Sequence, residues 1–202
     1  MKVTRLLIGL LVLAGFALPA MAQPAKTQRI RGTVTAVSDT SITVKSRDGT
    51  DLKIALDPDW SVLAVLPLSL ADIKTGSYVG IAALPQPGGE EKALEVLVFP
   101  EAARGSGEGH YPWDLMPQST MTNATVAAMV EASQGRELSL SYKDGTQKIL
   151  VPTDAPIVTF APDQRDLLVP GAAIFCSANV AADGGLSVKR VLVGKNGLVP
   201  PM

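Results

Sequence analysis

The residues best suited to chemistry lie in one irregular stretch, residues 100–123, which holds the only histidine of the chain and one of its two tryptophans. The imidazole of His110 and the thioethers of Met116 and Met121 are donors that a soft cation such as Cu(I) accepts. A zinc site needs repeated His or Cys spacing, which the sequence lacks. We therefore predict no cofactor and a hydrogen-bonding role for His110 within a folded connector, with metal binding as the alternative.

An aromatic and proline cluster, Tyr111-Pro112-Trp113, lies in the same stretch. Such a cluster could stack on a sugar ring or hold a peptide, or it could clamp the connector against the folded parts of the chain. We favour the clamp, because the chain is poor in aromatics and a loop of this length must be held in place. The two roles are compatible if the clamp forms the lip of a groove. The candidate ligand-binding residues are Arg104, His110, Tyr111, Trp113 and Asp114.

The sequence contains no recognisable catalytic set. Cys176 is the sole cysteine and corresponds to an apolar core position in the first half of the chain, so we interpret it as a buried hydrophobe. Residues 105–107 lack the strand–turn–helix context of a nucleophile elbow, and no phosphate-binding loop follows them. The Asp57-Pro58-Asp59 sequence is typical of a turn and should end a strand. We predict that the protein is not an enzyme, with an envelope hydrolase as the least favoured alternative.

The N-terminus has the pattern of a secretory signal. Lys2 and Arg5 precede an apolar run, and Ala20-Met21-Ala22 supplies small residues for cleavage before Gln23. The run is short for a membrane anchor, so we expect a signal peptide over residues 1–22 and no integral membrane span after cleavage. The product would be periplasmic or secreted in a bacterium. The 18 basic and 19 acidic residues of the full chain are balanced, which argues against a nucleic-acid partner.

Two runs of short alternating strands flank the central stretch. The first predicts strands over residues 30–37, 42–46, 52–56, 78–84 and 92–99, with a short helix between Ser69 and Gly76. The second repeats the pattern: Gly49-Thr50 aligns with Gly145-Thr146, and Gly76 aligns with Gly171. We therefore predict an all-β protein with minor helix, built as two tandem five-stranded OB-like barrels; two packed open sheets are the alternative. The expected divisions are lead-in 23–29, first barrel 30–99, connector 100–123, second barrel 124–194 and tail 195–202.

The motifs resemble those of a known group of proteins. A Gly32-Thr33-Val34 first strand, an Asp-Gly hairpin and the pattern L-x-D-I-K-x-G-x-x-V-G over residues 70–80 resemble bacterial exported domains of unknown function with small β-barrel folds. The connector GEGHYPWD, followed by STMTNATV, is similar to one two-repeat group of them. The resemblance implies a fold and no established activity. We expect binding of an envelope protein or of a small or polymeric ligand, with an accessory metal-binding protein of an envelope transport system as the alternative.

The signal pattern generates the first prediction. The native protein should begin at Gln23 and be recovered in soluble form from the periplasm or medium, which N-terminal sequencing of the purified protein measures. Recovery of Met1 in the membrane fraction would contradict the assignment.

Overall fold

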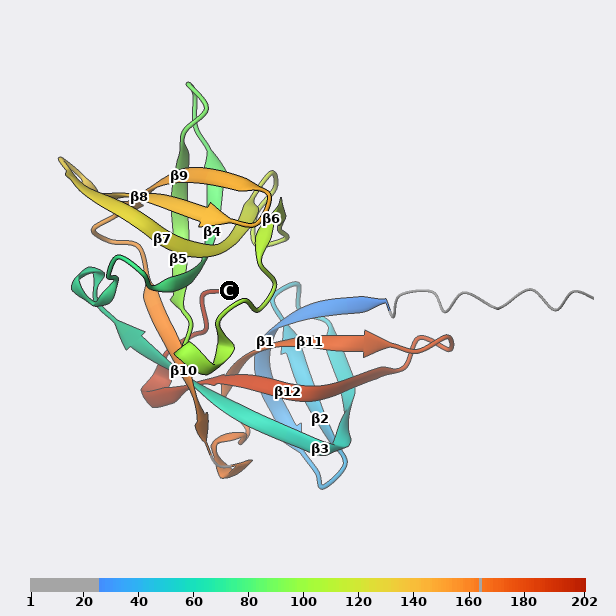
Figure 1. Ribbon diagram of the computed structural model, residues 1–202. Coiled ribbons are helices and arrows are strands. Elements are labelled where there is room, and N and C mark those ends of the chain that lie inside the picture. The colour runs from blue at the N-terminus through green and yellow to red at the C-terminus, as the bar shows by residue number, and fades with distance from the viewer. Residues whose placement is uncertain (1–25, 164) are drawn as a thin grey trace, which may run out of the picture.

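The computed structural model describes residues 26–163 and 165–202, an all-β fold with short 3₁₀ turns (Figure 1). The expected signal peptide and residues 23–25 of the lead-in lie outside these residues. Among the described residues, no helix is long and apolar enough to cross a membrane. The strands are β1 (Thr27–Val37), β2 (Ser41–Ser46), β3 (Asp51–Leu68), β4 (Tyr78–Pro85), β5 (Glu91–Val98), β6 (Gly109–Pro112), β7 (Thr120–Ala132), β8 (Gly135–Tyr142), β9 (Gly145–Pro152), β10 (Ile157–Asp163), β11 (Ala173–Val180) and β12 (Leu186–Gly194).

Five strands close into a barrel, which we call ring 1. Strand β1 pairs with β2, β2 with β3, β3 with β12, β12 with β11, and β11 again with β1. The seam between β3 and β12 is parallel and the other seams are antiparallel. The close approach of β1 to β2 requires glycine, because a Cβ on Gly32 would lie 2.2 Å from the Lys45 carbonyl oxygen. Alternate apolar residues of the five strands fill the interior, among them Ile30, Val44, Ile54, Cys176 and Val191.

A second ring, ring 2, has the same plan. Strands β4, β5, β7, β8 and β9 pair in the order β7–β8–β9–β5–β4–β7. The parallel seam is again the one between the third strand and the last, here β9 and β5, and it is short: only Glu91 and Lys92 of β5 take part. Its interior is a separate apolar cluster that includes Ile81, Val96, Leu138 and Ile149.

The two rings exchange strands, which differs from the predicted tandem arrangement. Ring 1 takes three strands from the first half of the chain and the β11–β12 hairpin from the second, while ring 2 takes β4–β5 from the first half and three strands from the second. Figure 1 shows this as blue strands beside red ones in one ring and green strands beside yellow and orange ones in the other. The closed rings therefore do not coincide with the expected divisions 30–99 and 124–194, although the strand order within each expected repeat is present.

The exchange is carried by two long crossing segments. Strand β3 does not end at Asp57-Pro58-Asp59, as predicted; its pairing with β12 passes from Leu56 directly to Ser61, so the aspartates and the proline lie in a bulge. Beyond the bulge β3 pairs antiparallel with β10, from Val62 opposite Asp163 to Leu68 opposite Ile157. This pairing is symmetric, because Val62 and Leu68 of the first repeat correspond to Ile157 and Asp163 of the second. Strands β3 and β10 each lead the chain from one ring into the other.

The remaining elements also refine the predictions. The helix after Ser69 is a single 3₁₀ turn, Leu70–Asp72, with a capping box: the Asp72 carboxylate accepts from the Ser69 amide. The same carboxylate also accepts from the Ser69 hydroxyl. Further 3₁₀ turns span Glu101–Ala103, Arg165–Leu167 and Lys195–Gly197. The tail packs against the fold: Met202 is buried with Val65 of β3 and Val158 of β10, between the rings.

The exchange generates the second prediction. A fragment ending at Phe99 lacks the β11–β12 hairpin that closes ring 1 and cannot be a folded monomer with the native pairing. Residues 26–99 and 100–202, produced separately, should be unfolded or self-associated, and an equimolar mixture should recover the circular dichroism spectrum and size of the intact chain. A monomeric, cooperatively folded 26–99 fragment would show instead that each half closes its own barrel.

Candidate functional site

A cavity of about 100 Å³ lies between the two rings. Ring 2 supplies residues of β4 and β5, ring 1 supplies residues of β11 and β12, and the connector and Met202 complete the wall. The wall is mostly apolar and includes four aromatic side chains from distant parts of the chain: Phe99, Tyr111, Trp113 and Phe175. In a chain so poor in aromatics, this concentration marks the inter-ring cavity as the candidate site.

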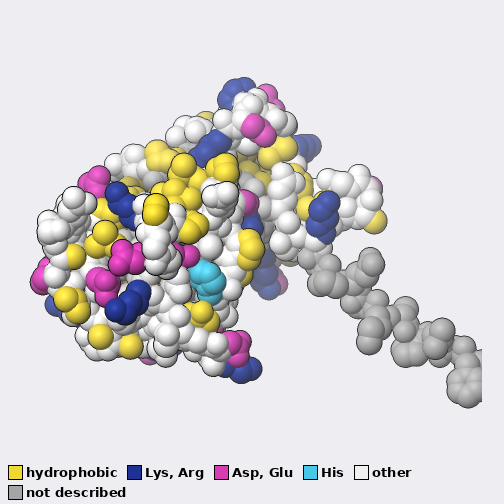
Figure 2. All heavy atoms as spheres, turned by 90° about the horizontal axis from the view of Figure 1, so that it is seen from above, with side chains coloured by type: hydrophobic (Ala, Val, Ile, Leu, Met, Phe, Trp, Pro, Cys, Tyr) yellow, Lys and Arg dark blue, Asp and Glu magenta, His cyan; other side chains and the backbone are white. Residues whose placement is uncertain are grey.

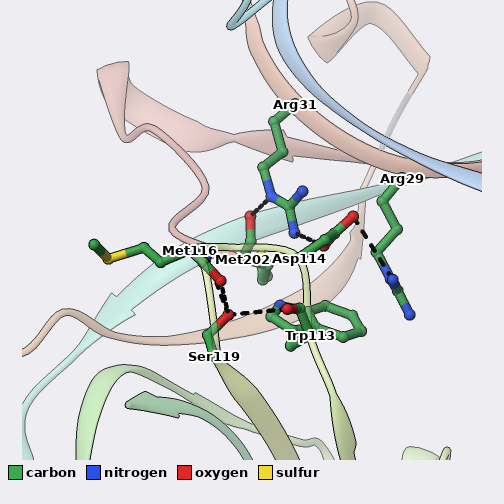
Figure 3. A network of polar contacts seen from close by, with 7 residues as sticks. All are labelled: Arg29, Arg31, Trp113, Asp114, Met116, Ser119 and Met202. Atoms are coloured by element: carbon green, nitrogen blue, oxygen red, sulfur yellow. Dashed lines mark hydrogen bonds and ion pairs between the residues drawn. The ribbon is translucent and has the colours of Figure 1, made fainter.

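A hairpin places the two connector aromatics in the wall. Strand β6 pairs antiparallel with β7, and the loop between them is closed by a hydrogen bond from the Trp113 amide to the Ser119 carbonyl. The buried Ser119 hydroxyl donates toward the carbonyl oxygens of Trp113 and Met116, at 3.0 and 2.8 Å (Figure 3). The rings of Tyr111 and Trp113 pack edge to face, with their centroids 6.2 Å apart. The connector is therefore a packed part of the fold.

Two arginines of β1 hold the connector against ring 1. The guanidinium of Arg29 lies 3.8 Å from the centre of the Trp113 ring, and Arg31 donates to Asp114 at 2.8 Å (Figure 3). Partial burial opposes ionisation of Asp114, but the hydrogen bond and charge of Arg31, with the charge of Arg29, hold its pKa below the usual value. Arg31 also donates to the Met202 carbonyl oxygen. This cluster fixes Trp113 from the side opposite to ring 2.

Three polar side chains in the cavity wall have buried atoms without a hydrogen-bond partner among the described residues. They are both carboxyl oxygens of Glu95, the indole Nε1 of Trp113 and the amide oxygen of Asn123. Asn123 uses its amide nitrogen elsewhere, donating to the Ser106 carbonyl and the Tyr111 hydroxyl. Gly80 leaves room for the amide oxygen, since a Cβ there would lie 2.6 Å from it. Buried polar atoms are rarely left unpaired, so this cluster requires an explanation.

Glu95 is the most unusual of the three. It lies on β5 opposite Ala82 and is 0 % exposed, because its side chain points out of ring 2 into the contact with ring 1. Burial raises its pKa to about 8, against the opposing effects of the Arg31 charge and the nearby Ala82 backbone. At neutral pH the carboxyl group is therefore mainly protonated, with one hydrogen to donate and one oxygen free to accept.

The predicted site residues divide into two groups. Tyr111 and Trp113 line the cavity, and Asp114 holds the arginines beside it. Arg104 lies at the start of the connector, where it pairs with Glu101 and donates to the Gly76 carbonyl oxygen. His110 faces away from the cavity, and Figure 2 shows its side chain (cyan) at the surface. Arg104 and His110 therefore do not belong to the inter-ring site.

The set of His110, Met116 and Met121 is not brought together as a metal site. In the β6–β7 pair His110 lies opposite Thr122, while Met121 lies opposite Tyr111 and faces the cavity. The alternation of a strand thus turns His110 and Met121 to opposite faces. Met116 lies in the hairpin loop, 47 % exposed. Among the described residues no three His, Cys, Asp or Glu side chains form a metal-binding group.

The surroundings of His110 have the composition of a nucleophile–histidine–acid set. Its Nδ1 lies 2.9 Å from the Thr122 hydroxyl, and its Nε2 lies 4.0 Å from the Glu91 carboxylate. Such catalysis also needs a nucleophile that a substrate can reach. Thr122 is 0 % exposed, so its hydroxyl cannot meet a substrate in this structure. Cys176 is equally inaccessible, because it is buried in ring 1. The same burial raises the pKa of its thiol to about 12.

The predictions from sequence did not identify Glu95, Phe99, Phe175 or Met202. Glu95 alternates with apolar residues along β5, a pattern that suggests a solvated outer face of a barrel. That face is buried only because the other ring packs on it. Comparison of the chain with protein-family models, with curated proteins and with solved structures found no match.

The raised pKa of Glu95 generates the third prediction. Between the unfolded pKa near 4.5 and the folded value near 8, the folded state binds the extra proton, so stability should fall as pH rises through this window and level off above it. Glu95→Gln should remove the decline and raise stability at pH 7 by on the order of 3 kcal/mol.

Urea denaturation at a series of pH values measures both effects. Glu91→Gln is the matched control: Glu91 is also a buried carboxyl group on β5, but Thr120 donates to it at 2.9 Å and it lies outside the cavity. A pH profile of Glu95→Gln that follows that of the wild type would show that Glu95 is ionised in the folded protein.

Proposed function

We propose that the protein is an exported, non-enzymatic binding protein whose inter-ring cavity takes a small, neutral, mainly apolar molecule with one hydrogen-bonding group. The observation that carries the proposal is the convergence of Glu95, Trp113 and Asn123, whose unpartnered buried atoms line one cavity. A ligand group that both donates and accepts would satisfy these atoms without bringing a charge into an apolar site. Export rests on the signal-like N-terminus.

The chemistry of the wall favours a neutral ligand over a cation. Aromatic side chains beside a carboxylate suit an organic cation in general. Here the carboxyl group of Glu95 is mainly protonated at neutral pH, and the guanidinium groups of Arg29 and Arg31 lie against the outer side of the Trp113 ring. A cation would therefore meet two positive charges and only a weakly ionised partner.

The size of the cavity restricts the ligand to a few non-hydrogen atoms, about the size of a single six-membered ring. A polymer could enter only with an end group. The strand order of each ring, with its one parallel seam, supports an OB-like classification of the barrels once the exchange of hairpins is taken into account. Barrels of this type commonly serve binding.

The fourth prediction tests the ligand class with Trp113 as the reporter. Trp60→Phe leaves Trp113 as the only tryptophan, and Trp60 packs against ring 1 and Arg165, away from the cavity. In this background, phenol should change Trp113 emission saturably and bind about tenfold more tightly than toluene, which has a similar shape and no hydrogen-bonding group. Benzylammonium should bind most weakly.

Two variants make the test specific. Glu95→Leu should reduce the preference for phenol over toluene, because only Trp113 and Asn123 remain to bond the hydroxyl, while Glu91→Gln should retain it. Affinity for phenol should decline as pH rises through about 8, because ionised Glu95 cannot donate. Absence of saturable binding by all three probes would refute the proposal, and tightest binding of benzylammonium would replace the neutral ligand by a cation.

A further inference from the structure

A second hollow, separate from the cavity, lies on the outer surface of ring 1. Its volume is about 350 Å³, and it is formed by β1, the β2–β3 hairpin and the connector residues Asp114 and Leu115. It shares no lining residue with the inter-ring cavity. We call it the arginine groove, because Arg29, Arg31 and Arg47 all line it.

The acidic residues of the groove are already engaged. Asp114 pairs with Arg31 at 2.8 Å and with Arg29 at 3.6 Å. Asp48 accepts hydrogen bonds from the Ser46 hydroxyl and the Thr50 amide, which close the hairpin turn. Three guanidinium groups and two carboxylates leave the groove with a formal charge of +1.

Arg47 carries the unbalanced charge. Its guanidinium has no hydrogen bond or ion pair to any residue in the described part of the chain. Desolvation, followed by repulsion from the like charge of Arg31, lowers the pKa of Arg47. The Arg47 amide donates to the Arg31 carbonyl oxygen at 3.1 Å, so the hairpin lies beside β1, and both guanidinium groups line a hollow whose two carboxylates are already engaged.

We propose that the arginine groove binds a single anionic oxygen group, a carboxylate or a phosphate, carried by a small polar molecule. Arg47 is the principal contact and can bind such a group through two parallel N–H donors, while Arg31 contributes its charge from the other side. A bound monoanion makes the groove neutral and relieves the repulsion between Arg47 and Arg31. The side chain of Gln28, which also lines the groove, can contact the polar body of the ligand.

Pairs of probes that differ in charge test this site. Glucuronate and glucose differ by one carboxylate, and inorganic phosphate represents the other anion. In two-dimensional NMR titrations at low ionic strength, glucuronate or phosphate should shift the backbone amides of Arg47 and Thr50 saturably, and glucose should not. The anion that binds more tightly, glucuronate or phosphate, identifies the ligand class. Added sodium chloride should weaken binding.

The variant Arg47→Gln should weaken anion binding about tenfold or more, as expected for loss of a charge-assisted hydrogen bond. The control is Arg190→Gln, which removes the same charge from the exposed side of β12, outside the groove. Both variants should keep the wild-type unfolding midpoint. The proposal is overturned if neither anion binds, if glucose binds as well as glucuronate, or if Arg190→Gln weakens binding as much as Arg47→Gln. Without an added anion, phenol binding should be unchanged in Arg47→Gln, because Arg47 does not line the cavity.

Discussion

The parallel seam between β3 and β12 is the constraint on which the rest of the structure depends. It joins the first half of the chain to the last strand, and without it the order β3–β2–β1–β11–β12 would be an open sheet with free edges at β3 and β12. The equivalent seam between β5 and β9 closes ring 2, although through far fewer residues. Because each half supplies the closing hairpin of the other ring, neither ring can be complete until both halves have met. The two barrels are therefore one cooperative unit, and the crossing strands β3 and β10 fix the way in which they face each other.

The exchange also creates the site. The crossing strands place the outer face of β5 in ring 2 against β11 and β12 of ring 1. A surface that an isolated barrel would expose to water is therefore buried. Glu95 lies on that face, which explains both its burial and the raised pKa. Keeping a carboxyl group without a partner in such a place costs stability, and a core built for stability alone would hold an apolar residue there. The same reasoning applies to the indole nitrogen of Trp113, whose ring is held by Arg29 on one side and faces the cavity on the other.

Sequence reasoning recovered what local chemistry dictates and failed where strand pairing over long distances decides. The alternation of apolar residues and the Asp48-Gly49 turn predicted the strands, and the Ser69–Asp72 capping box is present. Which hairpin closes which ring depends on whether β3 turns back or continues past Pro58, and a proline in a bulge leaves no distinct signal. The connector aromatics were identified because they are rare in this chain. Glu95 was missed because its burial comes from the packing of one barrel on another, which no single strand encodes.

The connector joins the two proposed sites in a way that neither barrel could. Trp113 faces the inter-ring cavity and Asp114, the next residue, faces the arginine groove, so one hairpin loop carries a wall of each. Arg29 contacts both residues, through the face of the indole ring and through the carboxylate. An anion in the groove competes with Asp114 for the guanidinium groups of β1, and loosening of that contact would free the Trp113 ring on its outer side. Occupancy of the groove should therefore alter the affinity of the cavity, and by thermodynamic linkage the cavity must alter the groove to the same extent. The connector is then the element through which the two proposed sites would be coupled.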